Sequence, residues 1–214
     1  MGKGLLRRPR ERLLVNNLPM KKDFTLVWDI DDVLNRLTHD WLELFWRPSH
    51  PECKTTYADL TSNPPHESLG IPLHTYLESL DAFRFSAIAK SLAPVPETLD
   101  WFQKHGHRYR HLALTARPVA SAPDAAEWVL RHYGRWIRGF GFVPSPRPGE
   151  NLPDYGKTKA EWLQWISVGD VLIDDSPFNL AGAHQIGIRT VMIPQPWNVT
   201  PGTIADSLLE LSTF

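Results

Sequence analysis

Three short apolar segments of the sequence each end in polar side chains. They are residues 24–28 before Asp29, Asp31 and Asp32, residues 111–114 before Thr115, and residues 171–173 before Asp174 and Asp175. Such runs are typical of buried strands, and the segments between them carry the apolar spacing of helices. Alternating strands and helices predict a mostly parallel α/β sheet with helices on both faces, in which ligands bind beyond the carboxyl ends of the strands. We therefore expect the three polar ends to meet at one site.

The other elements follow from apolar periodicity, helix caps and turn residues. We expect helices at about residues 34–45, 76–90, 96–104, 125–133 and 159–166 and from Pro177, and strands at about 139–143 and 190–193. Residues 47–93 contain five prolines and interrupt the alternation of strands and helices. We interpret this part of the chain as a lid inserted after the first strand. The expected organisation is a basic tail (1–22), a core (23–35 and 94–214) and a helical insertion (36–93).

Residues 158–161 mark the start of a helix. Thr158 and Glu161 match a capping box, in which the two side chains satisfy each other's exposed backbone N–H groups. This places Lys159 at the first helical position, and Lys157 precedes the same helix.

Length and composition limit the classes of function. The 214 residues suffice for one α/β domain with a modest insertion. A formal net charge of −1 gives no overall basic field for a nucleic-acid polymer. No apolar run approaches the roughly 18 to 20 residues of a membrane-spanning helix, and the single cysteine, Cys53, cannot form an intrachain disulfide. We expect a cytoplasmic protein with a small-molecule ligand and neither a nucleic-acid nor a membrane partner, and the oligomeric state stays open.

The first 22 residues differ from the rest of the chain. They carry seven Lys or Arg and one Glu, a net charge of +6 that leaves −7 for the remaining residues. We place this segment outside the fold. It is interpreted as a solvated basic tail or the product of a start codon placed too early, with Met20 as the alternative start. An organelle-targeting peptide and an anion-contacting arm are the other two interpretations.

Acidic residues at converging strand ends repel one another unless a cation compensates their charge. Carboxylate oxygens suit a hard ion such as Mg²⁺, which binds one or two carboxylates, retains several waters and contacts substrate phosphate. The sequence therefore predicts a Mg²⁺ site at the strand ends.

Four groups of residues, in chain order, resemble the four motifs of the haloacid dehalogenase (HAD) superfamily. They are Asp29-Ile30-Asp31, Thr115, Lys159, and Asp174-Asp175 with Asn179. The resemblance covers the chain from residue 24 to about residue 195. It implies a Rossmann-like HAD core, a small helical cap of the C1 type inserted after the first strand, and a phosphomonoester hydrolase that uses Mg²⁺.

The resemblance also implies roles for single residues. Asp29 is the nucleophile that forms an aspartyl-phosphate. Asp31 protonates the leaving group and then activates water for the second step. Thr115 hydrogen-bonds the phosphoryl oxygens, and Lys159 neutralises their charge in the transition state. Lys159 is preferred for this role because it begins the helix and because Leu163 follows four residues later, as in the family pattern; Lys157 stays the alternative.

The implied Mg²⁺ ligands are Asp29, the backbone carbonyl of Asp31, and Asp175. Asp174 acts on the ion through a water, and Asn179 orients the pair of acids.

Three further positions need an interpretation. Asp32 stands where the family commonly has glycine, and we expect it to serve an unusual backbone conformation that Asp tolerates. Trp46 is a candidate substrate contact because its ring could stack on a base. Arg117 is another, because its planar guanidinium could bind a phosphate or a carboxylate. The alternative for Arg117 is an ordinary ion pair.

These features favour a Mg²⁺-dependent phosphatase that hydrolyses a small phosphorylated metabolite through an aspartyl-phosphate. The motifs and the cap resemble the 5'(3')-deoxyribonucleotidase-like branch most, so a nucleotide is a candidate substrate. Two alternatives stay open: a phosphomutase of the same family, and a non-catalytic phospho-ligand binding or scaffold protein.

Overall fold

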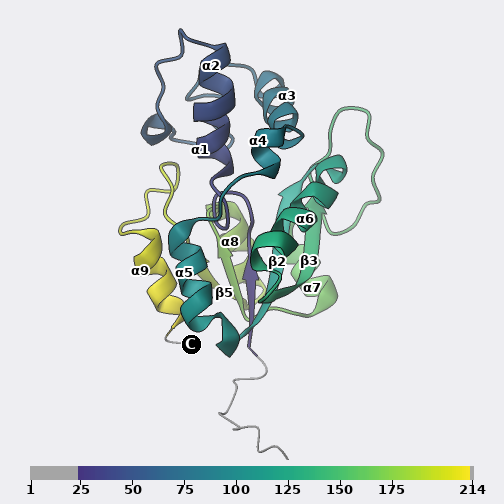
Figure 1. The fold of residues 1–214 in the computed structure, drawn as a ribbon. Helices are drawn as coiled ribbons and strands as arrows, with labels where there is room; N and C mark the ends of the chain where they lie inside the picture. Colours follow the sequence, from purple (N-terminus) through teal and green to yellow (C-terminus); the bar gives the residue numbers. More distant parts are fainter. Residues whose placement is uncertain (1–23, 213–214) are drawn as a thin grey trace, which may run out of the picture.

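The structure, a computed structural model, describes residues 24–212, so the basic segment lies outside the described residues. A five-stranded sheet forms its centre (Figure 1). The strands are β1 (Thr25–Trp28), β2 (Arg110–Arg117), β3 (Ile137–Pro144), β4 (Val171–Asp174) and β5 (Arg189–Met192). They lie in the order β3-β2-β1-β4-β5, and every neighbouring pair is parallel. The predicted parallel α/β fold is therefore confirmed.

The register of the sheet sets which residues meet at its carboxyl edge. Trp28, the last residue of β1, pairs with Ala113 of β2 and with Ile173 of β4. The residues that follow these three therefore lie toward the same carboxyl edge of the sheet. Asp29 is one position beyond Trp28, and Thr115 is two positions beyond Ala113.

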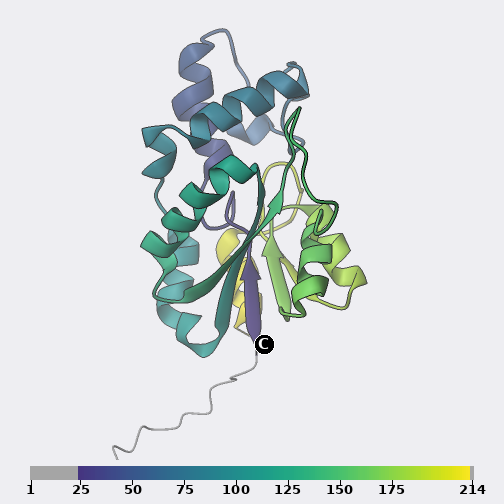
Figure 2. The same ribbon diagram turned by 90° about the vertical axis from the view of Figure 1, so that its right-hand side faces the viewer.

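Helices cover both faces of the sheet (Figure 2). The helices of the core are α5 (Pro96–His105), η3 (Gly106–Arg108), η4 (Val119–Ser121), α6 (Ala122–Tyr133), α7 (Lys159–Ile166), α8 (Pro177–Gln185) and α9 (Ile204–Leu211). Leu26 and Trp28 pack in one hydrophobic cluster with α5, α6 and α9. Val27, on the opposite side of β1, packs in another cluster with α7 and α8. The alternation of side chains along the strand thus fixes the two layers.

Residues 37–92 form a helical insertion beyond the carboxyl ends of the strands (Figures 1 and 2). It contains α1 (Leu37–Trp41), the π-helix η1 (Leu42–Trp46), α2 (Arg47–Ser49), η2 (Tyr57–Asp59), α3 (Leu73–Arg84) and α4 (Ala87–Lys90). The insertion has its own hydrophobic cluster, which includes Trp41, Tyr76 and Phe83. Trp197, from the segment after β5, joins this cluster and connects the insertion to the core.

Two helices of the insertion differ from the sequence-based prediction. The first begins at Leu37 rather than residue 34, and Leu44, expected on its apolar face, is 52% exposed. Leu44 points outward because residues 42–46 form the π-helix. A π-helix holds more residues per turn than an α-helix and so rotates its side chains away from the predicted face. The single helix expected at residues 76–90 is two helices. Ser86 separates them because its side chain accepts a hydrogen bond from the Ala89 N–H and caps α4.

The cap of α7 and the presence of α9 also differ from the sequence-based prediction. The Thr158 hydroxyl accepts the N–H of Glu161, as expected, but the Glu161 carboxylate accepts the backbone N–H of Lys157 rather than that of Thr158. Only half of the predicted capping box is therefore present. The sequence pattern also gave no indication of α9, which packs against α5 and β5 and buries Leu208.

Among residues 24–212, no helix has the length and apolar character needed to cross a membrane.

Candidate active site

The acidic residues that follow β1 and end β4 meet at the carboxyl edge of the sheet. The Asp29 N–H donates to the Ile173 carbonyl at 2.9 Å, which continues the β1–β4 pairing by one residue. One carboxylate oxygen from each of Asp29, Asp174 and Asp175 lies within 4.8 Å of the others. All three residues are buried, and the most exposed, Asp29, is 7% exposed. The structure therefore brings these three acids together, as expected from the strand ends.

Lys159 lies inside this acidic cluster. Its Nζ atom is 2.7 Å from Asp29 Oδ1 and 2.7 Å from Asp174 Oδ2, and its side chain is 1% exposed. Lys157, the alternative lysine, forms an exposed ion pair with Asp154 and lies outside the site. Of the two lysines, Lys159 is the one that reaches the acids.

Two local features position α7 and hence Lys159. Thr158 caps the helix by accepting the N–H of Glu161 at 3.1 Å, which makes Lys159 the first helical residue. Trp162 packs directly on the backbone of β3 at Gly141. A Cβ atom at Gly141 would lie 2.2 Å from Trp162 Cζ2, so only glycine allows α7 to approach the sheet this closely.

Burial and mutual repulsion dominate the electrostatics of the cluster. Burial raises the pKa of Asp29 well above its usual range; Lys159 opposes this rise, and the neighbouring acids add to it. Burial also raises the pKa of Asp175 well above its usual range, with Asp174 adding to the effect. Burial alone would lower the pKa of Lys159, but the attraction of Asp174 and Asp29 raises it.

One ammonium compensates only part of the charge of three carboxylates. The unsatisfied negative charge and the all-oxygen donor set fit a hard divalent cation such as Mg²⁺. The side chains present are therefore suitable for the ion that the sequence predicts.

Hydrogen bonds hold Asp174 in a fixed orientation. Its Oδ1 accepts the Ser176 N–H at 2.9 Å, and the Asn179 amide lies 3.2 Å from both carboxylate oxygens. Ser176 also caps α8, as predicted, by accepting the N–H of Asn179. Asn179 was expected to orient both acids, but its described side-chain hydrogen bonds go to Asp174 and not to Asp175.

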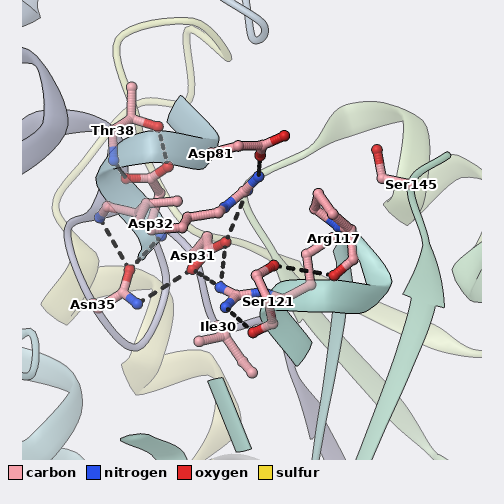
Figure 3. A network of polar contacts seen from close by, with 12 residues as sticks. Ile30, Asp31, Asp32, Asn35, Thr38, Asp81, Arg117, Ser121 and Ser145 are labelled. Carbon is pink, nitrogen blue, oxygen red and sulfur yellow. Dashed lines mark hydrogen bonds and ion pairs between the residues drawn. The ribbon is translucent and has the colours of Figure 1, made fainter. Parts of the chain in front are cut away.

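Asp31 is held by two arginines (Figure 3). Arg117 Nη2 lies 2.6 Å from both carboxylate oxygens, and Arg84 Nη2 lies 3.4 Å from Oδ2. Burial alone would raise the pKa of Asp31, but Arg117 and Arg84 outweigh it and lower that pKa. Asp31 is therefore ionised, the form that can accept a proton.

The ionic contacts extend from Asp31 to the surface of the core. Arg84, at the end of α3 in the insertion, contacts Asp81 Oδ1 through Nη1 at 3.1 Å. Asp81 in turn receives two hydrogen bonds from Arg147, which follows β3, at 2.5 and 2.9 Å. A continuous chain of ion pairs thus connects the insertion to two segments of the core.

Asp32 has the backbone role expected of it. Its φ of 65° lies in the left-handed region, which Asp tolerates better than most residues. Its carboxylate accepts the backbone N–H of Thr38 at 2.9 Å and the Thr38 hydroxyl at 2.5 Å. Burial raises the pKa of Asp32 to about 7, although the bonds from Thr38 lower it. Asp32 therefore fixes the turn between β1 and the insertion.

Thr115 is 1% exposed and lies at the same edge of the sheet as the acids, as the register requires.

Trp46 does not lie where a substrate contact would need it. It is 5% exposed, its ring stacks on His50 with a centroid separation of 3.7 Å, and it belongs to the hydrophobic cluster of the insertion. Its ring packs within the insertion, where it is not available to stack on a base.

The segment after β5 contributes contacts that sequence reasoning missed. Trp197 donates its indole N–H to Asp175 Oδ2 at 2.9 Å, and Gln195 Nε2 donates to the Asp32 carbonyl at 2.6 Å. From the insertion, Asn63 Nδ2 lies 3.5 Å from Asp175 Oδ2. The only signal for Gln195 and Trp197 was their position directly after a predicted strand, where parallel sheets place site residues.

Comparison with known proteins identifies the fold. Neither a protein-family model nor a curated protein matches the sequence. Among solved structures, a haloacid dehalogenase-like hydrolase from Streptococcus pneumoniae aligns with 88% of this chain and 90% of its own, with a TM-score of 0.54 and 16% identity. The HAD-hydrolase YfnB from Bacillus subtilis, bound to magnesium, aligns with 90% of this chain and 98% of its own, with a TM-score of 0.53 and 13% identity. A haloacid dehalogenase-like hydrolase from Burkholderia xenovorans gives the same coverage, with a TM-score of 0.54 and 16% identity. The chain therefore has the fold of the HAD-like hydrolases.

Proposed function

We propose that this protein is a HAD-type phosphatase that hydrolyses a small phosphomonoester through an aspartyl-phosphate, with Mg²⁺ as its cofactor. The observation that carries the proposal is the position of Lys159 Nζ, 2.7 Å from both Asp29 and Asp174, with Asp175 in the same cluster. A buried ammonium beside several carboxylates can accommodate a divalent cation and a phosphoryl group together.

Asp29, Asp175 and the backbone carbonyl of Asp31 are the proposed Mg²⁺ ligands. Asp174 would contact the ion through a water, and Asn179 keeps Asp174 oriented through its 3.2 Å contacts. When bound, the ion compensates the negative charge of the acids and polarises the phosphoryl oxygens.

Asp29 is the proposed nucleophile of the first step. A carboxylate oxygen of Asp29 forms a bond to phosphorus while the bond between phosphorus and the leaving-group oxygen breaks. Asp31, which the described structure holds as a carboxylate beside Arg117, must first leave that arginine and take up a proton from solvent. It then delivers this proton to the leaving-group oxygen, so that the leaving group departs as an alcohol. Thr115 donates a hydrogen bond to the phosphoryl oxygens, and Lys159 stabilises their charge.

Water completes the reaction in the second step. Its oxygen attacks phosphorus and the bond to Asp29 breaks, which releases inorganic phosphate and restores the Asp29 carboxylate. The Asp31 carboxylate accepts the proton of the attacking water and is thereby returned to its acid form. The lowered pKa of Asp31 beside Arg117 and Arg84 favours the carboxylate that this step needs.

We also propose that residues 36–93 act as a cap of the C1 type over a core of residues 23–35 and 94–214. Asp29, Asp174 and Asp175 are at most 7% exposed, so a substrate can reach them only when the insertion moves away from the core. Closure would then exclude water from the aspartyl-phosphate until the leaving group has departed. Because Trp46 stacks on His50, it does not support a nucleobase site, and the nucleotidase-like branch and the cytoplasmic location stay predictions.

The proposal is tested by phosphate release from p-nitrophenyl phosphate and from a panel of phosphorylated metabolites, with Mg²⁺ and with EDTA. We expect release that requires Mg²⁺ and is lost in Asp29→Asn, while circular dichroism shows an intact fold. Asp154→Asn removes an exposed acid outside the site and serves as the matched control, with activity retained. Undiminished turnover by Asp29→Asn, or no release from any ester, would contradict the proposal. An isomerised sugar phosphate in place of inorganic phosphate would instead indicate the phosphomutase alternative.

A further inference from the structure

Two arginines from different parts of the chain meet at the Asp31 carboxylate. Arg117 ends β2 in the core, whereas Arg84 ends α3 in the insertion, and their side chains are 6% and 9% exposed. We propose that Arg84 and Arg117 together form a binding site for a second anionic group of the substrate, a carboxylate or a further phosphate carried by the leaving group. This inference deepens the proposed phosphatase function and rests on it.

Each guanidinium has a buried donor that is not used. Arg117 donates to Asp31 through Nη2 and to the Ser121 carbonyl through Nη1 at 3.4 Å, while its Nε has no partner among the described residues. Arg84 uses Nη1 for Asp81 and Nη2 for Asp31, and its Nε likewise has no described partner. Native structures rarely leave buried N–H groups unpaired. The Asp31 carboxylate already accepts from the Nη2 atoms of both arginines, and another oxyanion with several lone pairs can do the same.

The closed structure has no room for such an anion beside the arginines. Arg84 and Arg117 line a cavity of about 30 Å³ together with Leu37, Leu92 and Trp128. A space of this size admits water but not a carboxylate or a phosphate. The anionic group must therefore take the place that the Asp31 carboxylate now occupies.

The proposed chemistry requires this exchange. Asp31 has to turn toward the leaving-group oxygen, which separates its carboxylate from the two arginines. The described ionic chain already contains three guanidiniums, from Arg84, Arg117 and Arg147, against the carboxylates of Asp31 and Asp81. Without a replacement anion, two buried cations would face each other with less compensation than before, which is strongly unfavourable.

The two arginines come from different parts of the molecule, so binding of the second anionic group is linked to closure of the insertion over the core. Because Arg84 belongs to the insertion and Arg117 to the core, an anion bound by both joins the two parts of the molecule. A substrate that carries the second anionic group therefore stabilises the closed site, whereas a neutral leaving group does not. Specificity for doubly anionic esters follows from this arrangement.

Matched substrate pairs test the inference. Phosphoglycolate is compared with its carboxamide, and 1,3-propanediol bisphosphate with the monophosphate, so that the two arms distinguish a carboxylate from a phosphate as the second anion. For at least one pair, we expect the wild-type kcat/KM to be at least about tenfold higher for the more anionic member, a difference typical of one charge-assisted contact. This ratio should fall toward one in Arg84→Gln. Arg131→Gln, which removes an exposed arginine of α6, should retain it.

Two further measurements separate the possible failures. In Asp29→Asn, which cannot form the phosphoenzyme, calorimetry compares the dissociation constants of each pair, and the more anionic member should again bind at least about tenfold more tightly. Arg84→Lys retains the positive charge without the planar guanidinium and should give an intermediate ratio of kcat/KM within each pair if the guanidinium binds the anion.

Equal kcat/KM and equal binding within both pairs, or an equal loss on both members in Arg84→Gln, would overturn the inference. Absence of turnover with a preserved difference in binding would overturn the phosphatase function and leave the anion site standing.

Discussion

The Lys159 ammonium lies 2.7 Å from the Asp29 carboxylate, although Asp29 directly follows β1 and Lys159 begins α7, 130 positions further along the chain. The contact is almost fully enclosed, with side-chain exposures of 1% and 10%. Lys159 therefore has a structural task as well as its proposed role in catalysis, since it supplies a positive charge inside a group of buried acids.

The stability of the protein should depend on this ammonium. In EDTA, Lys159→Gln is expected to lower the free energy of unfolding by about 3 kcal/mol, because it leaves buried carboxylates without their partner. Urea denaturation measures the change. Lys157→Gln, which removes the neighbouring exposed lysine, should leave the urea midpoint unchanged. A similar loss in both variants would mean that the buried contact does not stabilise the fold.

Magnesium should stabilise the folded protein. An ion that binds only the folded state at a hundred times its dissociation constant adds about 2.7 kcal/mol to the free energy of unfolding. We expect Mg²⁺ to raise the unfolding temperature of the wild type and to have a much smaller effect on Asp175→Asn, with Asp154→Asn as the exposed control. The effect should weaken as the pH falls, because the raised pKa values of Asp29 and Asp175 allow protons to compete with the ion. An undiminished shift in Asp175→Asn would place the ion elsewhere.

His111 should make stability depend on pH. Its Nδ1 accepts the indole N–H of Trp28 at 3.0 Å, so Nε2 carries the proton and donates to the Gly106 carbonyl at 2.7 Å. Burial lowers the pKa of His111 to about 4, against about 6.5 in an unfolded chain. Between these two values the unfolded chain binds a proton that the folded protein does not. The contribution of His111 is therefore fully present above about pH 6.5 and is lost as the pH falls to about 4, by about 3 kcal/mol in total.

Urea denaturation at several pH values checks this expectation. Asp29, Asp32 and Asp175, whose pKa values are raised, titrate with the opposite sign, and Asp31, whose pKa is lowered, titrates with the same sign. The difference between wild type and His111→Gln removes these contributions and isolates the histidine. That difference should shrink as the pH falls from about 6.5 to about 4. The same measurement on His107→Gln, at an exposed position, serves as the control. A constant difference would show that His111 does not change its protonation on unfolding.

Gly141 should be intolerant of a side chain. Gly141→Ala places a Cβ atom 2.2 Å from Trp162 Cζ2 and must displace α7 from the sheet. We expect the free energy of unfolding to fall by about 1–3 kcal/mol, as for other overpacked cores, and phosphatase activity to fall because Lys159 moves with the helix. A double-mutant cycle with Trp162→Ala gives the test: Gly141→Ala should cost clearly less when the indole is absent. Additive effects would rule out the steric contact as the cause.

The strands and the strand-end residues could be predicted because their signals are local. The apolar run before Asp29 and the cap at Thr158 each act within a few residues, and parallel topology then brings distant strand ends to one edge. The prediction that Lys159 rather than Lys157 reaches the acids depended on local signals, because the cap at Thr158 marks Lys159 as the first residue of the helix.

The remaining features depend on contacts between distant segments. The partnership of Arg84 with Asp31 requires the end of α3 to reach the turn that follows β1, and no local pattern specifies that position. The π-helix at residues 42–46 turns Leu44 outward against its apolar spacing, because packing within the insertion overrides periodicity. Trp197 lies in an irregular segment, where periodicity carries no information.

The order of the strands spreads the proposed site residues along the chain, and this limits which fragments could contain all of them. The residues proposed for the reaction are contributed by separate stretches that extend from Asp29 to Asp175. The indole that donates to Asp175 comes later still, at Trp197. A truncated translation product that stops before this tryptophan lacks a partner for one of the acids, and a fragment that begins after β1 lacks the residue proposed to attack phosphorus. The proposed set of site residues is therefore complete only when nearly all of the described chain is present, and no short contiguous stretch of it contains them all.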